Sequence, residues 1–160
     1  MATPKRGFFV DPGLNGCGCA SFLGAELVWA RYIKNLPGAG LGPSAWATMA
    51  REAKDNFRGH DFVLIERQRV YPGPRGKKTD PNDLVDLSGV VGAIAYAAFA
   101  AAIPEVLGVF PAEWKGQVPK EVMNARVLSR LTDAEKERLH SKDHNTLDAV
   151  GIGLYYTKRL

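Results

Sequence analysis

Apolar residues gather along the chain in short runs that alternate with longer stretches of helical spacing. The short runs predict strands over residues 8–11, 17–22, 26–31, 62–66 and 106–110. The helical spacing predicts helices over residues 44–58, 81–103, 119–130 and 144–157, with a further short one at the capping pattern of Thr132 and Glu135. Three strands followed by alternating helices and strands indicate an α/β domain, a mixed sheet with helices on both faces.

Two of the apolar runs end in a single carboxylate, Asp11 and Glu66. A buried strand normally excludes charge, because an unpaired carboxylate moved out of water costs several kcal/mol or becomes neutral. Two such runs, separated by a helical stretch, indicate neighbouring strands that direct their acids to one point. Clustered carboxylates repel each other, and a hard cation relieves that repulsion. The pair therefore predicts a magnesium or manganese site.

A third candidate acid, Asp148, lies in the last helix within a segment of mostly small or apolar residues. His144 and Asn145, four and three residues earlier, share its helix face. The ordinary explanation for an acid in a first turn is the helix dipole. Gly151 and Gly153 permit close packing of this helix against the sheet, which would place Asp148 beside the two strand-end acids.

The size and composition of the chain suit one domain over residues 1–160, since 46% of the residues are hydrophobic. The formal net charge is only +4, so its distribution matters more than its total. Basic residues crowd the segment directly after Glu66, namely Arg67, Arg69, Arg75, Lys77 and Lys78. A solvated loop explains such a run, and so does a phosphate-binding surface beside a metal ligand.

The uncharged stretch over residues 87–103 is short for a membrane span and rich in Ala, Gly and Ser. It predicts instead a buried helix packed closely on the sheet of a soluble protein. The basic N-terminus is followed by no apolar signal core. Two cysteines, Cys17 and Cys19, are expected to be small core residues, and nothing in their spacing indicates an oxidising compartment. We therefore expect a cytoplasmic protein without a membrane partner.

Four motifs occur together over nearly the whole chain: Val10-Asp11-Pro12-Gly13, the apolar run into Glu66, the Asp80-Pro81-Asn82-Asp83-Leu84 helix start, and Asp148-Ala149-Val150-Gly151-Ile152-Gly153. Their order and spacing resemble those of the RuvC family of Holliday junction resolvases, in the RNase H-like superfamily, and particularly its phage-type members. The resemblance implies an RNase H-like fold with a mixed five-stranded sheet, whose first three strands form an antiparallel meander. It also implies a bacterial or phage-infected host cell.

The resemblance implies four side chains that hold two divalent cations, Mg²⁺ or in its place Mn²⁺, against the scissile phosphate, with no organic cofactor. Asp11 would bridge the ions, Glu66 would hold one, and Asp148 would complete the cluster. At the fourth position the family has an acid or histidine where this chain has Asn145. His144 is the favoured catalytic alternative, Asn145 would bind metal through its amide oxygen, and Asp143 is either a further alternative or the cap of the helix.

The resemblance also implies contacts with DNA. Arg69 and Tyr71 occupy positions where relatives reach opened base pairs, so Tyr71 would stack on a base. Lys115 and Lys120 belong to a basic stretch beside the active site and would bind phosphates or neutralise charge in the transition state. Trp114, directly before Lys115, is expected to pack against the protein rather than to stack on a base.

The expected function is a magnesium-dependent endonuclease that resolves four-way (Holliday) DNA junctions by paired symmetric nicks. A homodimer suits this substrate, and the Ala-rich helix over residues 83–103 would supply part of its interface or only core packing. Cleavage of flap, branched or RNA–DNA hybrid substrates is an alternative of the same chemistry. A non-catalytic junction-binding module is another, favoured by Asn145. A sugar-kinase-like or actin-like ATPase needs two lobes, for which this chain is too short.

Overall fold

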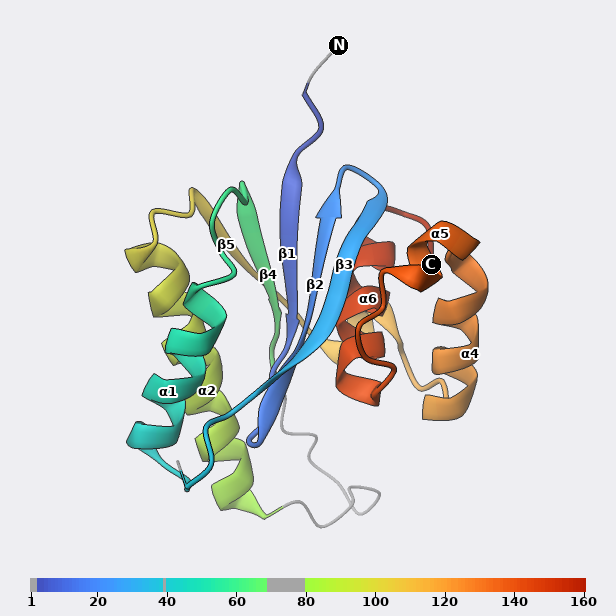
Figure 1. The fold of residues 1–160 in the computed structure, drawn as a ribbon. Helices are drawn as coiled ribbons and strands as arrows, with labels where there is room; N and C mark the ends of the chain where they lie inside the picture. The colour runs from blue at the N-terminus through green and yellow to red at the C-terminus, as the bar shows by residue number, and fades with distance from the viewer. Residues whose placement is uncertain (1–2, 39, 69–79) are drawn as a thin grey trace.

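The computed structural model describes residues 3–38, 40–68 and 80–160. Five strands form one sheet in the order β3-β2-β1-β4-β5 (Figure 1). The strands are β1 (Arg6–Asp11), β2 (Gly16–Leu23), β3 (Glu26–Lys34), β4 (Phe62–Glu66) and β5 (Glu105–Val109). Strands β1, β2 and β3 pair antiparallel, whereas β1–β4 and β4–β5 pair parallel. The predicted mixed sheet and antiparallel meander are confirmed.

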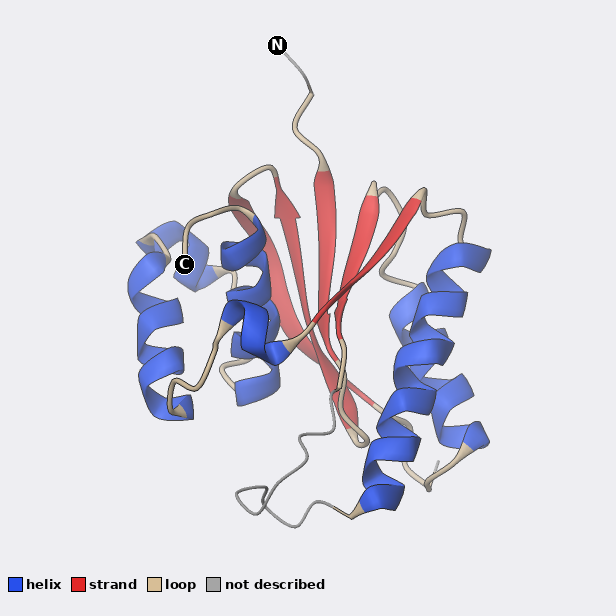
Figure 2. Ribbon diagram, turned by 180° about the vertical axis from the view of Figure 1, so that it is seen from behind, coloured by secondary structure: helices blue, strands red, loops and turns tan. Residues whose placement is uncertain are grey.

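Helices cover both faces of the sheet, as predicted (Figures 1 and 2). One face carries α1 (Pro43–Lys54) and α2 (Pro81–Ala100). The other carries α4 (Lys120–Arg130), α5 (Asp133–Glu137) and α6 (His144–Tyr156), while the short α3 (Pro111–Trp114) follows β5. The sequence did not predict α3, because four residues are too few to show a helical period.

Both faces of the central strands are buried, which explains why these strands read as continuous apolar runs. Side chains alternate between the faces along each strand. Phe9 and Leu64 pack with α4 and α6 in one core cluster, and Phe8 and Ile65 pack with α1 and α2 in the other. The sheet is therefore held from two sides, and its strand ends are positioned by two separate cores.

The predicted helix boundaries are close to the observed ones. Asp80 caps α2 by accepting a hydrogen bond from the backbone N–H of Asn82 at 2.8 Å, with Pro81 in the first turn, as predicted. Thr132 forms the predicted capping box with Glu135 at the start of α5. Helix α1 ends at Lys54 rather than at residue 58, because the chain turns there toward Gly59, whose φ is 78°.

Helix α2 is not the buried helix that the sequence predicted. By length and composition it is the one helix among the described residues that would suffice to cross a membrane, and 22% of its apolar window is buried. Val90 and Ile94 face the core, whereas Tyr96 and Phe99 are 71% and 74% exposed. The prediction failed because an absence of charge says that a helix is apolar, not which of its sides another element covers.

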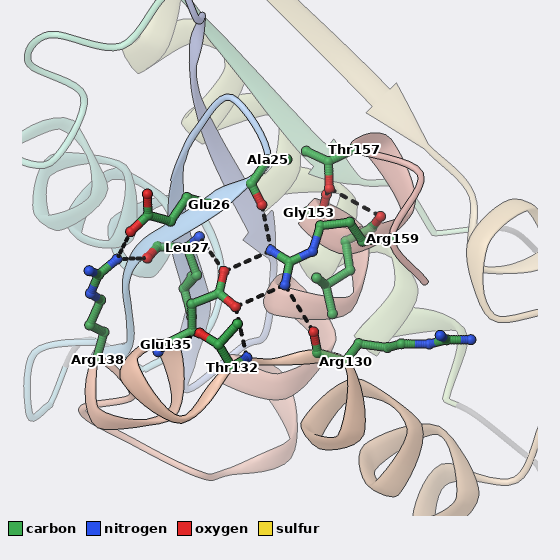
Figure 3. A network of polar contacts seen from close by, with 11 residues as sticks. Ala25, Glu26, Leu27, Arg130, Thr132, Glu135, Arg138, Gly153, Thr157 and Arg159 are labelled. Atoms are coloured by element: carbon green, nitrogen blue, oxygen red, sulfur yellow. Dashed lines mark hydrogen bonds and ion pairs between the residues drawn. The ribbon is translucent and has the colours of Figure 1, made fainter.

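A network of polar contacts around Glu135 joins the outer elements of the α6 side (Figure 3). Both carboxylate oxygens of Glu135 accept hydrogen bonds from Arg159, at 2.7 and 2.8 Å, and one also accepts from the backbone N–H of Leu27 at 2.9 Å. Arg159 further donates to the carbonyls of Ala25 and Arg130. The network thus ties the β2–β3 turn, the end of α4, α5 and the end of the chain together.

The two hydrogen bonds from Arg159 are the main reason that the pKa of Glu135 falls to about 2. A carboxylate with a depressed pKa stabilises the folded state above the pKa it has in the unfolded chain. That contribution is lost as the pH falls from the ordinary range of a glutamate toward 2.

Replacing one partner of the Arg159–Glu135 pair should make the protein easier to unfold. We expect Arg159→Met to lower the free energy of unfolding by about 3 kcal/mol, since it leaves the buried Glu135 carboxylate without its charged partner. The measurement is urea unfolding at neutral pH. Lys136→Ala, which breaks the exposed pair with Asp133 at 2.9 Å, is the control and should cost less than about 0.5 kcal/mol. An equal loss of unfolding free energy in the two variants would contradict a stabilising role for the Arg159–Glu135 pair.

Candidate active site

Asp11 and Glu66 end two neighbouring strands at the same edge of the sheet. Strands β1 and β4 run parallel with Val10 opposite Ile65, so the residue that follows each of these is an acid at the strand end. Both side chains are buried, with 7% of Asp11 and 3% of Glu66 exposed. The structure therefore brings the two strand-end acids together, as the sequence predicted.

Helix α6 brings the third acid to this edge. Asp143 caps the helix by accepting hydrogen bonds from the backbone N–H groups of Asn145 and Thr146, at 3.0 and 3.1 Å. The capping role considered for Asp143 is confirmed. Asp148 follows one turn later, on a segment buried from Thr146 to Leu154, and only 8% of it is exposed.

Glycines allow α6 to lie unusually close to the sheet. A Cβ on Gly18, the β2 residue paired with Asp11, would lie 1.8 Å from the backbone oxygen of Asn145. A Cβ on Gly151 would lie 2.5 Å from the Trp114 ring, and one on Gly153 would lie 2.3 Å from the Phe22 ring. The close packing predicted from the glycines of α6 is confirmed, and Gly18 supplies the other half of the contact.

Two residues from the β5–α3 region contact the acids. The indole N–H of Trp114 donates to Glu66 Oε2 at 2.7 Å. Lys115 Nζ lies 2.8 Å from Asp148 Oδ2 and 3.5 Å from Glu66 Oε2, and 4.7 Å from the centre of the Trp114 ring. The predicted packing role of Trp114 is confirmed, since it is 5% exposed. Its hydrogen bond to Glu66 was missed, because Trp114 lies in a four-residue helix that shows no helical period and so could not be placed beside β4.

The acid cluster carries more negative than positive charge. Burial, together with the negative charges of Glu66 and Asp148, raises the pKa of Asp11 well above its ordinary value, and Lys115 opposes this. Burial also raises the pKa of Glu66, against the effects of Lys115 and of the Trp114 hydrogen bond. Burial acts to lower the pKa of Lys115, but Glu66 and Asp148 outweigh it and raise that pKa, which keeps the ammonium charged. Three acids thus share one lysine.

The chemistry of the cluster fits a divalent cation. Burial and the neighbouring acids disfavour the charged form of Asp11, and a divalent cation bound at the cluster would favour it. Hard carboxylate oxygens in a negatively charged, partly closed site are ligands that Mg²⁺ and Mn²⁺ prefer. The described residues include no group of three His, Cys, Asp or Glu side chains already spaced to enclose a metal ion.

Solved structures share this arrangement of strands and helices. Thermus thermophilus RuvC in complex with Holliday junction substrate is 20% identical, with a TM-score of 0.69 over 96% of each chain. Thermus thermophilus RuvC is 21% identical, with a TM-score of 0.62 over 93% of this chain and 91% of that one. The yeast mitochondrial Holliday junction resolvase Ydc2 is 14% identical, with a TM-score of 0.63 over 99% of this chain and 82% of that one. This chain has the RuvC fold.

The likeness to RuvC lies in the structure rather than in the sequence. No protein-family model and no curated protein matches the chain. The fold class predicted from the four motifs, an RNase H-like α/β fold with a mixed five-stranded sheet, is confirmed. The phage-type subclass stays a prediction.

The residues predicted as the fourth ligand lie at the start of α6. The side-chain amide of Asn145 lies at the turn after β1, because its Nδ2 is 2.9 Å from where a Cβ on Gly13 would stand. His144, the first residue of α6, is exposed, and within the described part of the chain no hydrogen bond or ion pair joins it to the acids. Both His144 and Asn145 stay predictions as the fourth ligand.

The candidate DNA-binding residues differ in where they lie. Arg67 lies exposed at the end of β4, and Lys120 lies exposed at the start of α4. Lys115 lies among the acids, half-buried, rather than on the open surface. The others fall outside the described residues, namely Arg69, Tyr71, Arg75, Lys77 and Lys78.

The contact of α6 with Gly18 should be essential for the stability of this region. We expect Gly18→Ala to lower the free energy of unfolding by about 3 kcal/mol, because its Cβ would overlap backbone atoms that are unable to rotate away. Urea unfolding measures it. Ser129→Ala in α4 is the control, since the exposed Ser129 hydroxyl donates to the carbonyl of Arg126 in the same helix, and it should change stability by less than about 0.5 kcal/mol. A Gly18→Ala variant as stable as the wild type would contradict the close packing.

Proposed function

We propose that this protein is a metal-dependent endonuclease that resolves four-way (Holliday) DNA junctions by paired symmetric nicks in the cytoplasm. The observation that carries the proposal is the meeting of Asp11, Glu66 and Asp148 at one edge of a sheet with the RuvC fold. The substrate class is supported by the similar Thermus thermophilus structure, which is described as RuvC in complex with Holliday junction substrate.

The acids would hold two divalent cations, Mg²⁺ or Mn²⁺. When bound, such ions activate the attacking water and stabilise the leaving oxygen of a phosphodiester. Asp11 would contribute a carboxylate to the ions, since it is buried beside Glu66 and Asp148 and its pKa is raised by both. Glu66 would hold one, oriented by the Trp114 indole N–H on its Oε2. Asp148 would complete the set with Asn145 or His144.

Lys115 would contribute positive charge at the reacting phosphate. Its ammonium contacts both Glu66 and Asp148, so a phosphate bound at these acids would also lie near this positive charge. A fixed positive charge there would stabilise the charge that develops on the phosphate oxygens in the transition state. Exposed Arg67 and Lys120 would bind the DNA backbone on either side.

The RuvC fold would act here as a homodimer formed through α2. One side of α2 presents an uncharged, exposed stripe at helical spacing: Val85, Ser88, Gly92, Tyr96 and Phe99. Large residues at its ends and small ones at its middle let two copies cross closely, each large end covering the other. A two-fold dimer would present two acid clusters to a junction whose two strands must both be cut.

One observation favours a second candidate function, a junction-binding module without catalysis. The position three residues before Asp148 holds Asn145, whose amide oxygen binds a cation more weakly than a carboxylate does. Such a protein would bind a four-way junction and leave it intact with either Mg²⁺ or Mn²⁺.

The decisive experiment is to incubate the protein with a synthetic four-way junction and Mg²⁺ and to map the nicks. We expect nicks at symmetric positions in two strands of like polarity. Flap and RNA–DNA hybrid substrates, assayed alongside, would identify the other nucleases of this fold. Binding without cleavage in Mg²⁺ and in Mn²⁺ would instead support the non-catalytic module.

Asp11→Asn should separate cleavage from binding. The change keeps the shape of the side chain and removes one of the charges that attract the cations, so we expect cleavage to fall by at least about a thousandfold. Junction affinity, measured by fluorescence anisotropy, should stay within about threefold of the wild type. Asp61→Asn, at the opposite end of the sheet, where its side chain accepts from the backbone N–H of Arg6, is the matched control and should cleave normally. Full activity in Asp11→Asn would refute the nuclease assignment.

Phe99→Glu should separate the two subunits, because it places a charge in the apolar stripe of α2. We expect the molecular mass in light scattering to halve and paired nicking to be lost. Val122→Glu, on an equally apolar but separate exposed position of α4 (56% exposed), should leave the mass unchanged. A wild-type protein that is monomeric at all concentrations would contradict the dimer.

A further inference from the structure

Arg67 continues the sheet beyond Glu66 and lies along the neighbouring strand. Its backbone N–H donates to the carbonyl of Val109 at 2.7 Å, which extends the β4–β5 pairing by one residue. Its side chain then passes over Gly108 of β5, since a Cβ on Gly108 would lie 2.3 Å from Arg67 Cδ. The alkyl part of Arg67 therefore occupies the space that a side chain at position 108 would need.

The guanidinium of Arg67 lies over the ring of Phe110. Its Cζ is 4.8 Å from the ring centre, within the range of a cation–π contact. Phe110 is in turn held at the start of α3, where its backbone N–H donates to Glu113 Oε2 at 2.6 Å. The Arg67 side chain is thus in contact along its alkyl part, at Gly108, and at its guanidinium, at Phe110. These contacts restrict its rotamers, so it loses less conformational entropy when it binds a ligand.

Arg67 keeps its positive charge available for an anion. In the described parts of the chain no carboxylate lies within ion-pair distance of its guanidinium, and the segment 69–79 contains no Asp or Glu. The side chain is exposed although the residue before it is buried. The planar fork of an arginine matches two oxygens of a phosphate.

We propose that Gly108 and Phe110 are positioning residues that direct Arg67 to a backbone phosphate of the DNA next to the acid cluster. The inference rests on the proposed function and adds to it one defined contact. Phe110 is the residue directly before α3, and this short helix ends at Trp114, which hydrogen-bonds Glu66. The phosphate contact and the acid are thus held by one structural unit, so that binding at Arg67 would set the register of the strand over the cluster.

The test is the affinity for a labelled synthetic four-way junction, measured by anisotropy across a salt series in the Asp11→Asn background. Arg67→Ala should weaken binding about tenfold and reduce the slope of log K against log salt by about 1, the value for one phosphate contact. Arg67→Lys should recover the slope but only part of the affinity. Arg58→Ala is the matched control, an exposed arginine that precedes β4 at its opposite end, and it should change neither value.

The positioning role is tested by coupling between variants. Phe110→Ala and Gly108→Val should each weaken binding about threefold when Arg67 is present. Neither should weaken it further when Arg67 is already Ala. Losses that persist in the Arg67→Ala background, or an Arg67→Ala variant that behaves like Arg58→Ala, would overturn the inference. A parent protein that binds no junction would overturn the proposed function itself.

Discussion

The repulsion among three buried acids is the constraint on which the site depends. The cost of holding Asp11 beside Glu66 and Asp148 appears as a pKa of Asp11 that burial and both neighbouring acids raise well above its ordinary value. The pairing of β1 with β4 holds Asp11 beside Glu66, and the packing of α6 on β2 at Gly18, where no side chain intervenes, brings Asp148 to them. The free energy for this comes from the two apolar cores on either side of the sheet.

Within the cluster, Lys115 and Trp114 act in different ways. The ammonium of Lys115 offsets part of the repulsion, while the Trp114 indole fixes one oxygen of Glu66 without adding charge. Because both residues belong to the end of α3, that helix needs its own support. It receives it from the Trp114 ring, which fills the space above Gly151 of α6. The packing of α6 therefore positions Asp148 directly and Glu66 through Trp114.

The sequence was sufficient for those features that follow from a local rule. Asp11 and Glu66 could be joined because each ends an apolar run, and parallel strands bring such ends to one edge. The caps at Asp80 and Thr132 are equally local. The hydrogen bond from Trp114 to Glu66 spans 48 residues. The packing of the Arg67 side chain on Gly108 depends on the pairing of β5 with β4. Such contacts are created by the tertiary structure, so no pattern along the chain predicts them.

Helix α2 shows a second feature that the sequence could not predict, namely which of its faces is buried. Its composition was read correctly as apolar, yet composition assigns no faces, and the structure places Tyr96 and Phe99 in solvent. Natural surfaces rarely keep an exposed aromatic pair on an apolar stretch, here the part of α2 after Asp86, without a partner.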